Sequence, residues 1–310
     1  MIPQIIKNRY EVTKFLGKGA FGETYLAKDL DFPNHPFRVV KILRPQSNDP
    51  DTLQIARNLF QREAEVLSKL GKDDLIPELF AYFEYNQEFY LVQEWIEGED
   101  LTTEIYPGKK ITETEVIALL KDVLTALKTV HENNVIHRDL KPSNLMRRKK
   151  DGKIVIIDFG GVKEIATTGT PLQQTIIIGT PGYFPIEQSR GYPVLASDIY
   201  AVGIMAIQAL TGEFPILNDW EKQIKITPDF LKILKTMITD DLNIRYSSAT
   251  QTLNAINSLN WRKNIILWLG KIIVGVGAIA LFIAILSVSF NWSFRPSENQ
   301  KQTPPRGWTW

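Results

Sequence analysis

A group of acidic, basic and amide side chains lies close together in the middle of the sequence. Asp139 and Lys141 are followed by Asn144, and Asp158 comes fourteen residues after Asn144. A carboxylate at 139 can accept a proton from a hydroxyl group, and a lysine at 141 can neutralise charge on a phosphate. Asn144 and Asp158 offer the hard oxygen ligands that Mg²⁺ prefers. These residue types predict transfer of a phosphoryl group to a hydroxyl acceptor, which needs an oriented acceptor, a metal and charge neutralisation.

The alternative is a charged surface loop followed by Asp158-Phe159-Gly160 through chance. A strand-like run at 154–157 leads into Asp158, and both motifs occur in the order that a phosphoryl-transfer site requires. The stretch 137–144, His-Arg-Asp-Leu-Lys-Pro-Ser-Asn, together with the later Asp-Phe-Gly, resembles the eukaryotic-type protein kinases. Over roughly residues 10–259 the sequence is similar to bacterial, notably cyanobacterial, membrane members of that family. The resemblance implies an α+β bilobal fold, with a β-rich N-lobe at 10–93, a hinge at 94–98 and a mainly helical C-lobe at 99–260.

Three glycines near the N-terminus lie between two strand-like runs. Gly17-x-Gly19-x-x-Gly22 is a weak signal alone, and in a dinucleotide-binding fold it would open a helix. Thr24 and Tyr25 instead favour a second strand, so we expect a hairpin tip where backbone amides approach phosphates. An ordinary glycine hairpin is the alternative. The resemblance implies a flap over ATP made of Leu16, Gly17, Lys18, Gly19, Ala20, Phe21, Gly22, Glu23 and Thr24.

Lys41 lies in a strand-like run at 37–42 and, from the residues alone, is a solvated strand lysine. The resemblance implies that it binds the α- and β-phosphates and pairs with Glu63 on a predicted helix at 49–70. Glu65 is the alternative partner. Glu63 is preferred because the apolar residues after it then take the packing positions. The resemblance also places four residues around the adenine, namely Val39, Glu94, Ile96 and Met146. It places Gln93 behind the adenine, where a polar side chain has no explanation in the sequence.

The resemblance assigns roles to the residues of the central motif. Asp139 would orient and deprotonate the acceptor hydroxyl, and Lys141 would neutralise charge on the γ-phosphate. Asn144 and Asp158 would hold Mg²⁺. Lys41 and Glu63 would act with them as the catalytic pair. Lys141, two residues after the catalytic Asp, favours serine and threonine over tyrosine as acceptors, so the implied enzyme is a non-specific serine/threonine protein kinase.

Other segments must support these residues. Two strands are expected within 80–93, and Thr112-x-x-Glu115 predicts a capping box at the start of a buried helix that reaches His131. We expect His131 to be a helix-end residue and His137 to be structural. In the C-lobe an apolar helix is expected from 197 to 210. The resemblance implies that Asp198 anchors the catalytic loop, that Arg245 pairs with Glu187, and that Thr180 contacts Asp139 and Lys141.

The stretch 158–187 is predicted to be an activation segment. Its threonines Thr167, Thr168, Thr170 and Thr175 are candidate phosphorylation sites. Arg138 directly precedes the catalytic Asp, the arrangement in which family members bind a phosphorylated segment. The alternative is a threonine-rich loop without regulation.

Composition excludes several classes of function. The 310 residues hold 36 Lys and Arg against 35 Asp and Glu, so the balance gives no support for a nucleic-acid partner. Cys is 0, which excludes disulfides, thiolate metal sites and a cysteine nucleophile. The N-terminal lead, 1–9, lacks the pattern of a cleavable signal peptide.

A membrane segment is predicted after the kinase-like region. The 19 residues 272–290 contain no Asp, Glu, Lys or Arg. As a helix they would span about 28 Å, enough for the hydrocarbon core of a bilayer. A buried core helix is the alternative. We therefore expect a juxtamembrane stretch at 261–271, one transmembrane helix, a short extracytoplasmic tail at 291–310, and a cytoplasmic kinase domain, because ATP and Mg²⁺ are found there.

Three hypotheses for function remain at this level. The first is a membrane-anchored serine/threonine protein kinase in signalling that acts on protein substrates and uses self-association for autophosphorylation. The second is a catalytically weak, pseudokinase-like membrane scaffold, which would be favoured if Lys41, Asp139 or Asp158 were replaced. The third is a phosphotransferase for a small molecule, which the late matches at Glu187 and Arg245 disfavour.

Overall fold

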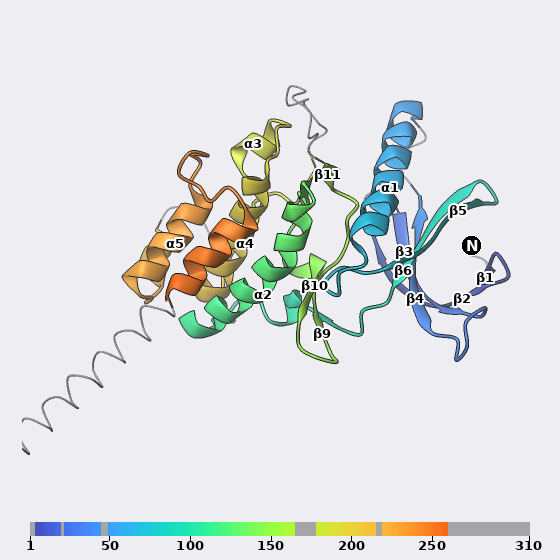
Figure 1. Ribbon diagram of the computed structural model, residues 1–310, viewed down its shortest axis with the longest axis horizontal. Coiled ribbons are helices and arrows are strands. Elements are labelled where there is room, and N and C mark those ends of the chain that lie inside the picture. Colours follow the sequence, from blue (N-terminus) through green and yellow to red (C-terminus); the bar gives the residue numbers. More distant parts are fainter. Residues whose placement is uncertain (1–3, 20–21, 45–48, 165–177, 215–218, 260–310) are drawn as a thin grey trace, which may run out of the picture. The chain divides into compact units, whose positions relative to one another are not determined.

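The computed structural model describes residues 4–19, 22–44, 49–164, 178–214 and 219–259 (Figure 1). The chain divides into two compact units, Met1–Leu259 and Asn260–Trp310, and every described residue belongs to the first. That unit has a sheet-rich part followed by a helix-rich part. The predicted α+β, bilobal architecture is therefore confirmed for the described residues.

The N-terminal part is a six-stranded antiparallel sheet in the order β1-β2-β3-β4-β6-β5. Its strands include the three runs predicted around the glycines and Lys41. Buried and less buried residues alternate along β3, as expected for strands with one face on a core. The strands are β1 Ile5–Ile6, β2 Tyr10–Lys18, β3 Gly22–Asp29, β4 Phe37–Leu43, β5 Leu79–Tyr85 and β6 Glu88–Glu94.

One long helix, α1 Pro50–Leu70, accompanies this sheet. The carboxylate of Asp49 accepts from the Thr52 amide at 2.9 Å and so caps its N-terminus, with Pro50 in the first turn. At the other end the Gly71 amide donates to the Leu67 carbonyl at 2.7 Å. The helix buries Phe60, Glu63 and Leu67 among other residues, so its buried face includes one carboxylate. The predicted helix at 49–70 is confirmed.

The C-terminal part is built on two long helices, α2 Glu113–Glu132 and α4 Leu195–Thr211. The capping box predicted at Thr112 is present, since its hydroxyl receives the Glu115 amide and the Glu115 carboxylate receives the Thr112 amide. Every residue of α4 after Leu195 is buried, because the other helices pack around it. Further helices are α3 Ile186–Ser189, α5 Pro228–Ile238 and the helical residues 249–259.

Short elements carry the chain through the region of the central motif. They are β7 Gly98–Asp100, η1 Leu101–Thr103, β8 Val135–Ile136, η2 Pro142–Asn144, β9 Leu145–Arg148, β10 Ile154–Ile156, β11 Lys163–Glu164 and η3 Trp220–Gln223. Strands β10-β9-β7 and β11-β8 form two small antiparallel sheets. These pairings hold the segments on either side of the motif His137–Asn144, called the catalytic loop below.

Several predictions lie outside the described residues. These are the flap tip at Ala20 and Phe21, the candidate phosphorylation sites Thr167, Thr168, Thr170 and Thr175, and the segments 261–271, 272–290 and 291–310. In the ranges that the structure does describe, none of the helices has both the length and the apolar character needed to cross a membrane.

Candidate active site

The predicted site residues meet in one cleft of about 920 Å³. Its lining comes from the β2–β3 hairpin, β4, α1, the end of β6, the catalytic loop and the Asp158 segment. All seventeen described residues that were predicted for the site line it: Leu16, Gly17, Lys18, Gly19, Gly22, Glu23, Thr24, Val39, Lys41, Glu63, Glu94, Ile96, Asp139, Lys141, Asn144, Met146 and Asp158. Residues that are far apart in sequence therefore converge on a single space.

Lys41 lies between two carboxylates. Its Nζ donates to Glu63 Oε1 and, at 2.9 Å, to Asp158 Oδ1. Glu63 is 3% exposed, whereas Glu65 lies on the exposed side of α1 and accepts from Gln61 at 2.8 Å. The structure thus pairs Lys41 with the carboxylate that the sequence favoured.

The charges of this trio depend on one another. Burial disfavours the ammonium form of Lys41, but Asp158 and Glu63 outweigh burial and raise the pKa of this lysine. The Lys41 charge lowers the pKa of Asp158 to about 2. Burial raises the pKa of Glu63, and Lys41 opposes that rise. Asp158 is therefore ionised at neutral pH, as a ligand for a cation must be.

The backbone presents the Asp158 carboxylate to the cleft. Asp158 follows β10 and has φ 64°, in the left-handed region that non-glycine residues seldom adopt. Its side chain is 48% exposed, while the next residue, Phe159, is fully buried with its ring edge-on to His137 at 5.1 Å. A strained conformation of this kind persists only where the surroundings hold it, here the buried phenylalanine and the Lys41 contact.

Both oxygens of the Asp139 carboxylate have defined partners. Thr180 donates its hydroxyl to Oδ1 at 2.7 Å, and Asn144 donates its amide to Oδ2 at 3.1 Å. Lys141 Nζ is 2.9 Å from Oδ2 and donates to the Thr180 hydroxyl at 2.8 Å. This network orients a carboxylate and an ammonium toward the same part of the cleft, and it includes the Thr180 contacts expected from the sequence.

The catalytic loop is held through its backbone. Asp198 on α4 is 1% exposed and accepts from the amides of His137 at 2.8 Å and Arg138 at 2.9 Å. Arg138 has φ 69°, so the chain turns sharply just before Asp139. A buried carboxylate with two amide donors is well satisfied and supplies a rigid anchor for the loop.

Packing within the sheet, as well as the approach of phosphates, explains a glycine in the β2–β3 hairpin. A Cβ on Gly22 would collide with the Ile42 carbonyl, because β3 lies against β4 at this point. The Gly19 amide donates to the Gly22 carbonyl at 2.8 Å across the hairpin. At Gly17, by contrast, a Cβ would meet nothing within 4 Å. Gly22 is thus required by sheet packing, while Gly17 faces open space in the cleft.

The sequence did not identify every residue of the cleft wall. Asp100 lines it, as do Ser143 and Gly161. The acidic run between Glu94 and Asp100, directly after β6, was the available signal for Asp100. Gln93 also lines the cleft; it is 4% exposed, and its Oε1 has no hydrogen-bond partner within the described ranges.

The donor set suits magnesium bound together with a phosphate ligand. Asn144 uses its Nδ2 to donate to Asp139, which leaves the amide oxygen as its ligand atom. Within the described part of the chain no three His, Cys, Asp or Glu side chains gather into a metal cage. Mg²⁺ ordinarily binds through one or two carboxylates, waters and substrate phosphates, so Asp158 and Asn144 fit that manner of binding.

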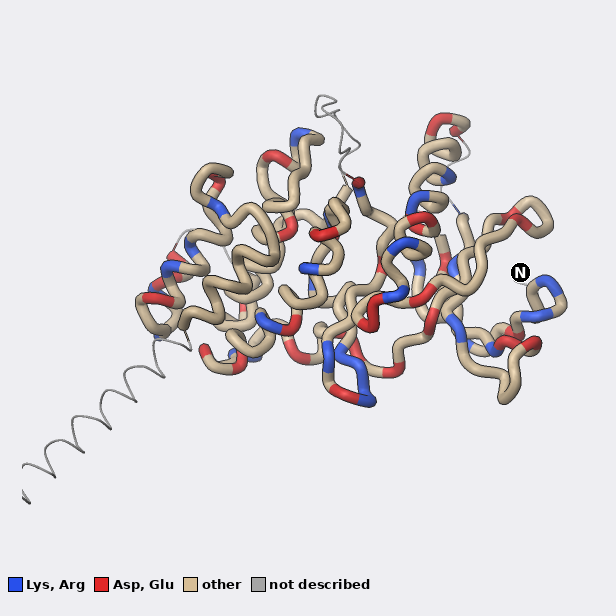
Figure 2. Tube along the Cα trace, in the orientation of Figure 1, with Lys and Arg blue, Asp and Glu red and all other residues tan. Residues whose placement is uncertain are grey.

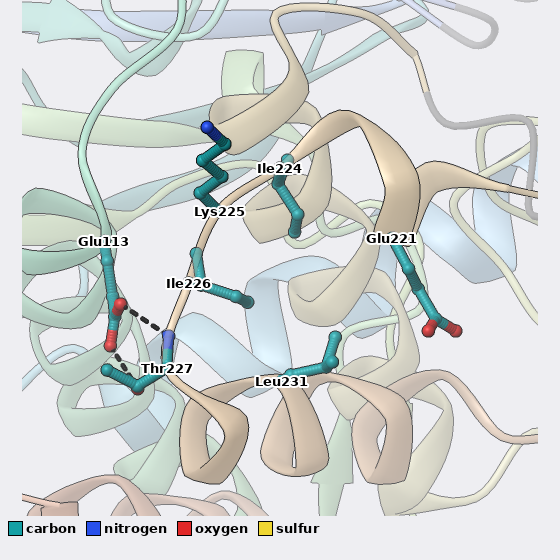
Figure 3. A pocket seen from close by; sticks show the side chains of 7 residues that line it. All are labelled: Glu113, Glu221, Ile224, Lys225, Ile226, Thr227 and Leu231. Carbon is teal, nitrogen blue, oxygen red and sulfur yellow. Dashed lines mark hydrogen bonds between the residues drawn. The ribbon is translucent and has the colours of Figure 1, made fainter.

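A second hollow, of about 460 Å³, lies in the helical part (Figure 3). Ile224, Ile226 and Leu231 contribute apolar surface, and Glu113 accepts from the amide of Thr227 at 2.9 Å at one side. None of its lining residues belongs to the central motif. It therefore does not compete with the larger cleft as the site of phosphoryl transfer.

The most basic stretch of the described chain is the β9–β10 hairpin, where Figure 2 shows Lys and Arg gathered. These cations have acidic partners close by. Arg148 contacts Asp74 and Asp151, both at 2.7 Å, and Arg147 bonds Glu104. These ion pairs offset the positive charges of the β9–β10 hairpin. The hairpin therefore presents less positive charge to solvent than its sequence suggests.

The sequence is similar to known proteins over most of its length. Residues 10–264 match the family described as "Protein kinase domain". "Serine/threonine-protein kinase B" of Synechocystis sp. is 39% identical over 267 residues, which is 81% of this chain and 46% of that protein. "Serine/threonine-protein kinase PknA" of Nostoc sp. is 41% identical over 269 residues, 82% of this chain and 48% of that protein.

More distant relatives show the same match. "Serine/threonine-protein kinase PknB" of Mycobacterium tuberculosis is 33% identical over 227 residues, 70% of this chain and 34% of that protein. The chain spans about half the length of the two cyanobacterial kinases.

Proposed function

This chain belongs to the protein kinase family, and from that premise we propose that it transfers the γ-phosphoryl group of ATP to serine and threonine hydroxyls of proteins. Its similarity to bacterial serine/threonine kinases agrees with the resemblance noted in the sequence. One observation carries the proposal. Asp139, oriented by Thr180 and Lys141, shares a cleft with the Lys41, Glu63 and Asp158 trio.

The cleft offers separate surfaces for the parts of ATP. Val39, Ile96 and Met146 provide apolar contacts for the adenine, and the backbone at Glu94 and Ile96 provides donors and acceptors. Lys41 provides the cation for the α- and β-phosphates. The volume of about 920 Å³ is within the range of pockets that bury a ligand of this size.

Asp158 and Asn144 would hold the magnesium ion. When bound, Mg²⁺ supplies neutralising charge to the phosphates and fixes their orientation. The low pKa of Asp158, about 2, keeps that carboxylate ionised at neutral pH. Asn144 links the metal site to the base, because its amide group donates to Asp139.

The proposed transfer needs no acid–base group other than the residues of this cleft. The acceptor oxygen forms a bond to the γ-phosphorus as the bond from that phosphorus to the β,γ-bridging oxygen breaks. The hydroxyl proton passes to Asp139, and ADP leaves with the bonding electron pair. Lys141 stabilises negative charge on the transferring group, and Thr180 keeps the Asp139 carboxylate turned toward the acceptor.

Two other functions are weaker. A pseudokinase-like scaffold is disfavoured because Lys41, Asp139 and Asp158 are all present and in mutual reach of one cleft. A small-molecule phosphotransferase is disfavoured by the buried pair of Glu187 and Arg245, whose Oε1 and Nη1 lie 2.6 Å apart. That pair belongs to the C-terminal set of motifs that marks protein kinases in the sequence.

The test uses the full chain with γ-labelled ATP, Mg²⁺ and a generic basic protein as acceptor. We expect label on protein, and after acid hydrolysis the label should be in phosphoserine and phosphothreonine. Label in phosphotyrosine alone would contradict the acceptor class. Binding of ATP without any labelled protein would favour the scaffold, and turnover of a metabolite without labelled protein would favour the small-molecule enzyme.

We also propose that the chain is anchored in a membrane by 272–290, with the kinase region on the cytoplasmic side and a role in signalling. The uncharged run of 19 residues supports the anchor, and the need for ATP supports the orientation. Self-association would allow phosphorylation of the activation segment at Thr167, Thr168, Thr170 or Thr175. Arg138 would bind the phosphate only after its buried guanidinium leaves the carbonyls of Gly161 and Val162, to which it donates in this structure.

A further inference from the structure

One arginine joins three neighbouring strands of the N-terminal sheet. Arg44 directly follows β4 and lies between a carboxylate near the start of β3 and one at the start of β6. Its Nη1 donates to Glu23 Oε2 at 3.0 Å, and its Nε and Nη2 donate to Glu88 Oε1 at 2.9 and 2.6 Å. These contacts, called the Arg44 bridge below, run from β3 across β4 to β6, the order in which the strands lie in the sheet.

A tyrosine on the same strand holds each of the two carboxylates from a second side. The Tyr25 hydroxyl donates to Glu23 at 2.8 Å. The Tyr90 hydroxyl donates to Glu88 at 2.6 Å. Both tyrosine rings are buried in the core on this face of the sheet. Side chains two residues apart on a strand point to the same face, so each tyrosine keeps its glutamate on the face where Arg44 lies.

The charges in the bridge are partly removed from water. The side chains of Arg44, Glu23 and Glu88 are all partly buried. The Tyr25 hydrogen bond and, to a smaller degree, Arg44 lower the pKa of Glu23, so this carboxylate is ionised at neutral pH. Fully exposed ion pairs contribute little, whereas hydrogen bonds between ionised groups are stronger when water is partly excluded. The bridge can therefore restrain the strands that it joins.

Glu23 connects the bridge to the nucleotide cleft. It directly follows Gly22 of the glycine flap and lines the cleft, whereas Arg44 and Glu88 lie outside the lining. Any influence of Arg44 on a bound nucleotide must therefore pass through Glu23 and the strand that carries it.

The flap has reason to need such a restraint. The β2–β3 pairing changes register between Phe15 and Gly17, next to the glycines. Glycine backbone is also less restricted than that of other residues. Lys18 is the register partner of Glu23 on the opposite strand, and its Nζ lies 3.9 Å from Glu23 Oε1. A fixed Glu23 therefore limits the positions that both strands of the flap can take.

We propose that Arg44 is a positioning residue for the phosphates of ATP. By joining Glu23 to Glu88 it holds the β3 side of the flap to the rest of the sheet, and so keeps the flap amides within reach of the phosphates. The inference rests on the proposed function and adds a residue outside the cleft to it. The bridge should affect binding of the triphosphate and not of adenosine, because Val39 and Met146, the apolar contacts proposed for adenine, have no part in it.

Three substitutions test the bridge. Arg44→Met removes its three hydrogen bonds and keeps a long side chain. Arg44→Lys keeps the charge, but an ammonium lacks the fork that reaches both carboxylates. Glu88→Gln removes a charge outside the cleft. Lys28→Met is the matched control, because it removes an exposed contact of 3.8 Å with Glu11 elsewhere on the same hairpin.

The experiment measures the dissociation constants of ATP and adenosine, KM for ATP, kcat and thermal unfolding in the full chain. We expect Arg44→Met to weaken ATP binding and raise KM by about fivefold, the effect of about one net hydrogen bond, and Glu88→Gln by about threefold. Arg44→Lys should lie between the wild type and Arg44→Met. Adenosine affinity and kcat should change by less than about twofold, as should every quantity in Lys28→Met.

The double variant Arg44→Met/Glu88→Gln tests whether the two residues act together. Its dissociation constant for ATP should equal that of Arg44→Met, because Glu88 acts only through the guanidinium. If Arg44→Met does not fold, Glu88→Gln decides the question through the same comparison of ATP with adenosine.

Three results would overturn the proposal. Equal losses of affinity for ATP and adenosine would show a general distortion of the sheet. Unchanged ATP affinity in Arg44→Met would show that the bridge does not restrain the flap. Effects of Arg44→Met and Glu88→Gln that multiply in the double variant would show that the residues act separately. Absence of phosphoryl transfer by the wild-type chain would instead refute the proposed function, since the dissociation constants are measured without transfer.

Discussion

At the scale of single residues, Lys41 places one positive charge between two carboxylates, Glu63 and Asp158, and so offsets their mutual repulsion. Glu63 is nearly inaccessible, and burial of a charged carboxylate is costly unless a cation compensates for it. Asp158 is half exposed and less dependent on compensation. Glu63 is therefore the residue whose protonation state is most sensitive to the loss of the lysine.

Replacing Lys41 by Met should make stability depend on pH near neutrality. The pKa of Glu63, already raised by burial, should rise further, so the folded variant retains a proton that the unfolded chain releases above its ordinary pKa of about 4.3. The free energy of unfolding should then fall as pH increases from about 5 to about 8. Chemical denaturation across this range measures the slope.

The control is the double variant Lys41→Met/Glu63→Gln. Without an ionisable group at 63, the added slope should disappear. A slope that persists in the double variant would show that Glu63 is not its source, and the proposed charge coupling at this site would be wrong.

The sequence supported prediction of the site at the level of residue types. The spacing of Asp139, Asn144 and Asp158 indicated phosphoryl transfer because few other reactions need those groups in that order. The choice of Glu63 over Glu65 could be made because the apolar residues after Glu63 then take the packing positions that the family resemblance implies. His131 was predicted only as a helix-end residue, since its partners Asp198 and Ala249 are distant in sequence and no local pattern indicates them.

At the scale of elements, a buried ion pair joins α3 to the segment after α5. Arg245 Nη1 is 2.6 Å from Glu187 Oε1, and the arginine also donates to the carbonyls of Thr239 and Ala196. The arginine side chain is fully buried and the glutamate is 10% exposed. Because Glu187 follows Thr180 in the chain, the pair fixes the end of the segment that carries Thr180.

Removing one partner of this pair should be strongly destabilising. Arg245→Met should lower the free energy of unfolding by about 3–5 kcal/mol, because Glu187 is left as an uncompensated buried charge. Lys222→Met breaks the exposed pair with Asp219 and should change stability by less than about 0.5 kcal/mol. Equal effects of the two substitutions in denaturant unfolding would contradict this account of the buried pair.

A substitution in the turn of the β5–β6 hairpin should instead raise the free energy of unfolding. Its two turn residues, Asn86 and Gln87, have φ 50° and 66°, the type of two-residue turn that favours glycine at its second position. Gln87→Gly should raise stability by about 0.5 kcal/mol, because a left-handed conformation costs glycine nothing.

Gln87→Ala is the matched control and should have nearly no effect, since alanine keeps the Cβ that makes this conformation unfavourable. If thermal unfolding shows the glycine variant to be less stable than the alanine variant, the turn does not carry the strain that its φ angles indicate.

Elements with strong local signals could be predicted from the sequence. The α1 boundaries followed from Asp49 and Pro50 at one end, and the α2 start followed from the capping box. The need for glycine at position 22 could not be predicted, because it comes from the close packing of β4 against β3 and not from the hairpin itself. The cleft wall at Asp100 was missed because it arises only when the two lobes are placed together.

At the scale of the whole molecule, the proposed membrane anchor determines where the kinase meets its substrates. Ile279→Lys/Ile283→Lys should release the full chain from membranes into the soluble fraction, because each lysine near the middle of a span costs about 2.5–3.5 kcal/mol for insertion. The matched control, Asn299→Lys/Gln300→Lys, adds the same charge outside 272–290 and should stay in the membrane fraction. Release of the control as well, or retention of both variants, would contradict the proposed anchor.

The most direct test of the central claim compares the full chain with Asp139→Asn. Transfer of label from γ-labelled ATP to protein and the dissociation constant of ATP are measured in parallel. If Asp139 receives the hydroxyl proton, the asparagine should slow transfer by about 10²–10⁴-fold, the range for a positioned acid or base. ATP affinity should change by less than about threefold, because no nucleotide contact is removed. Transfer by Asp139→Asn at the wild-type rate would contradict the assignment of this cleft as the active site.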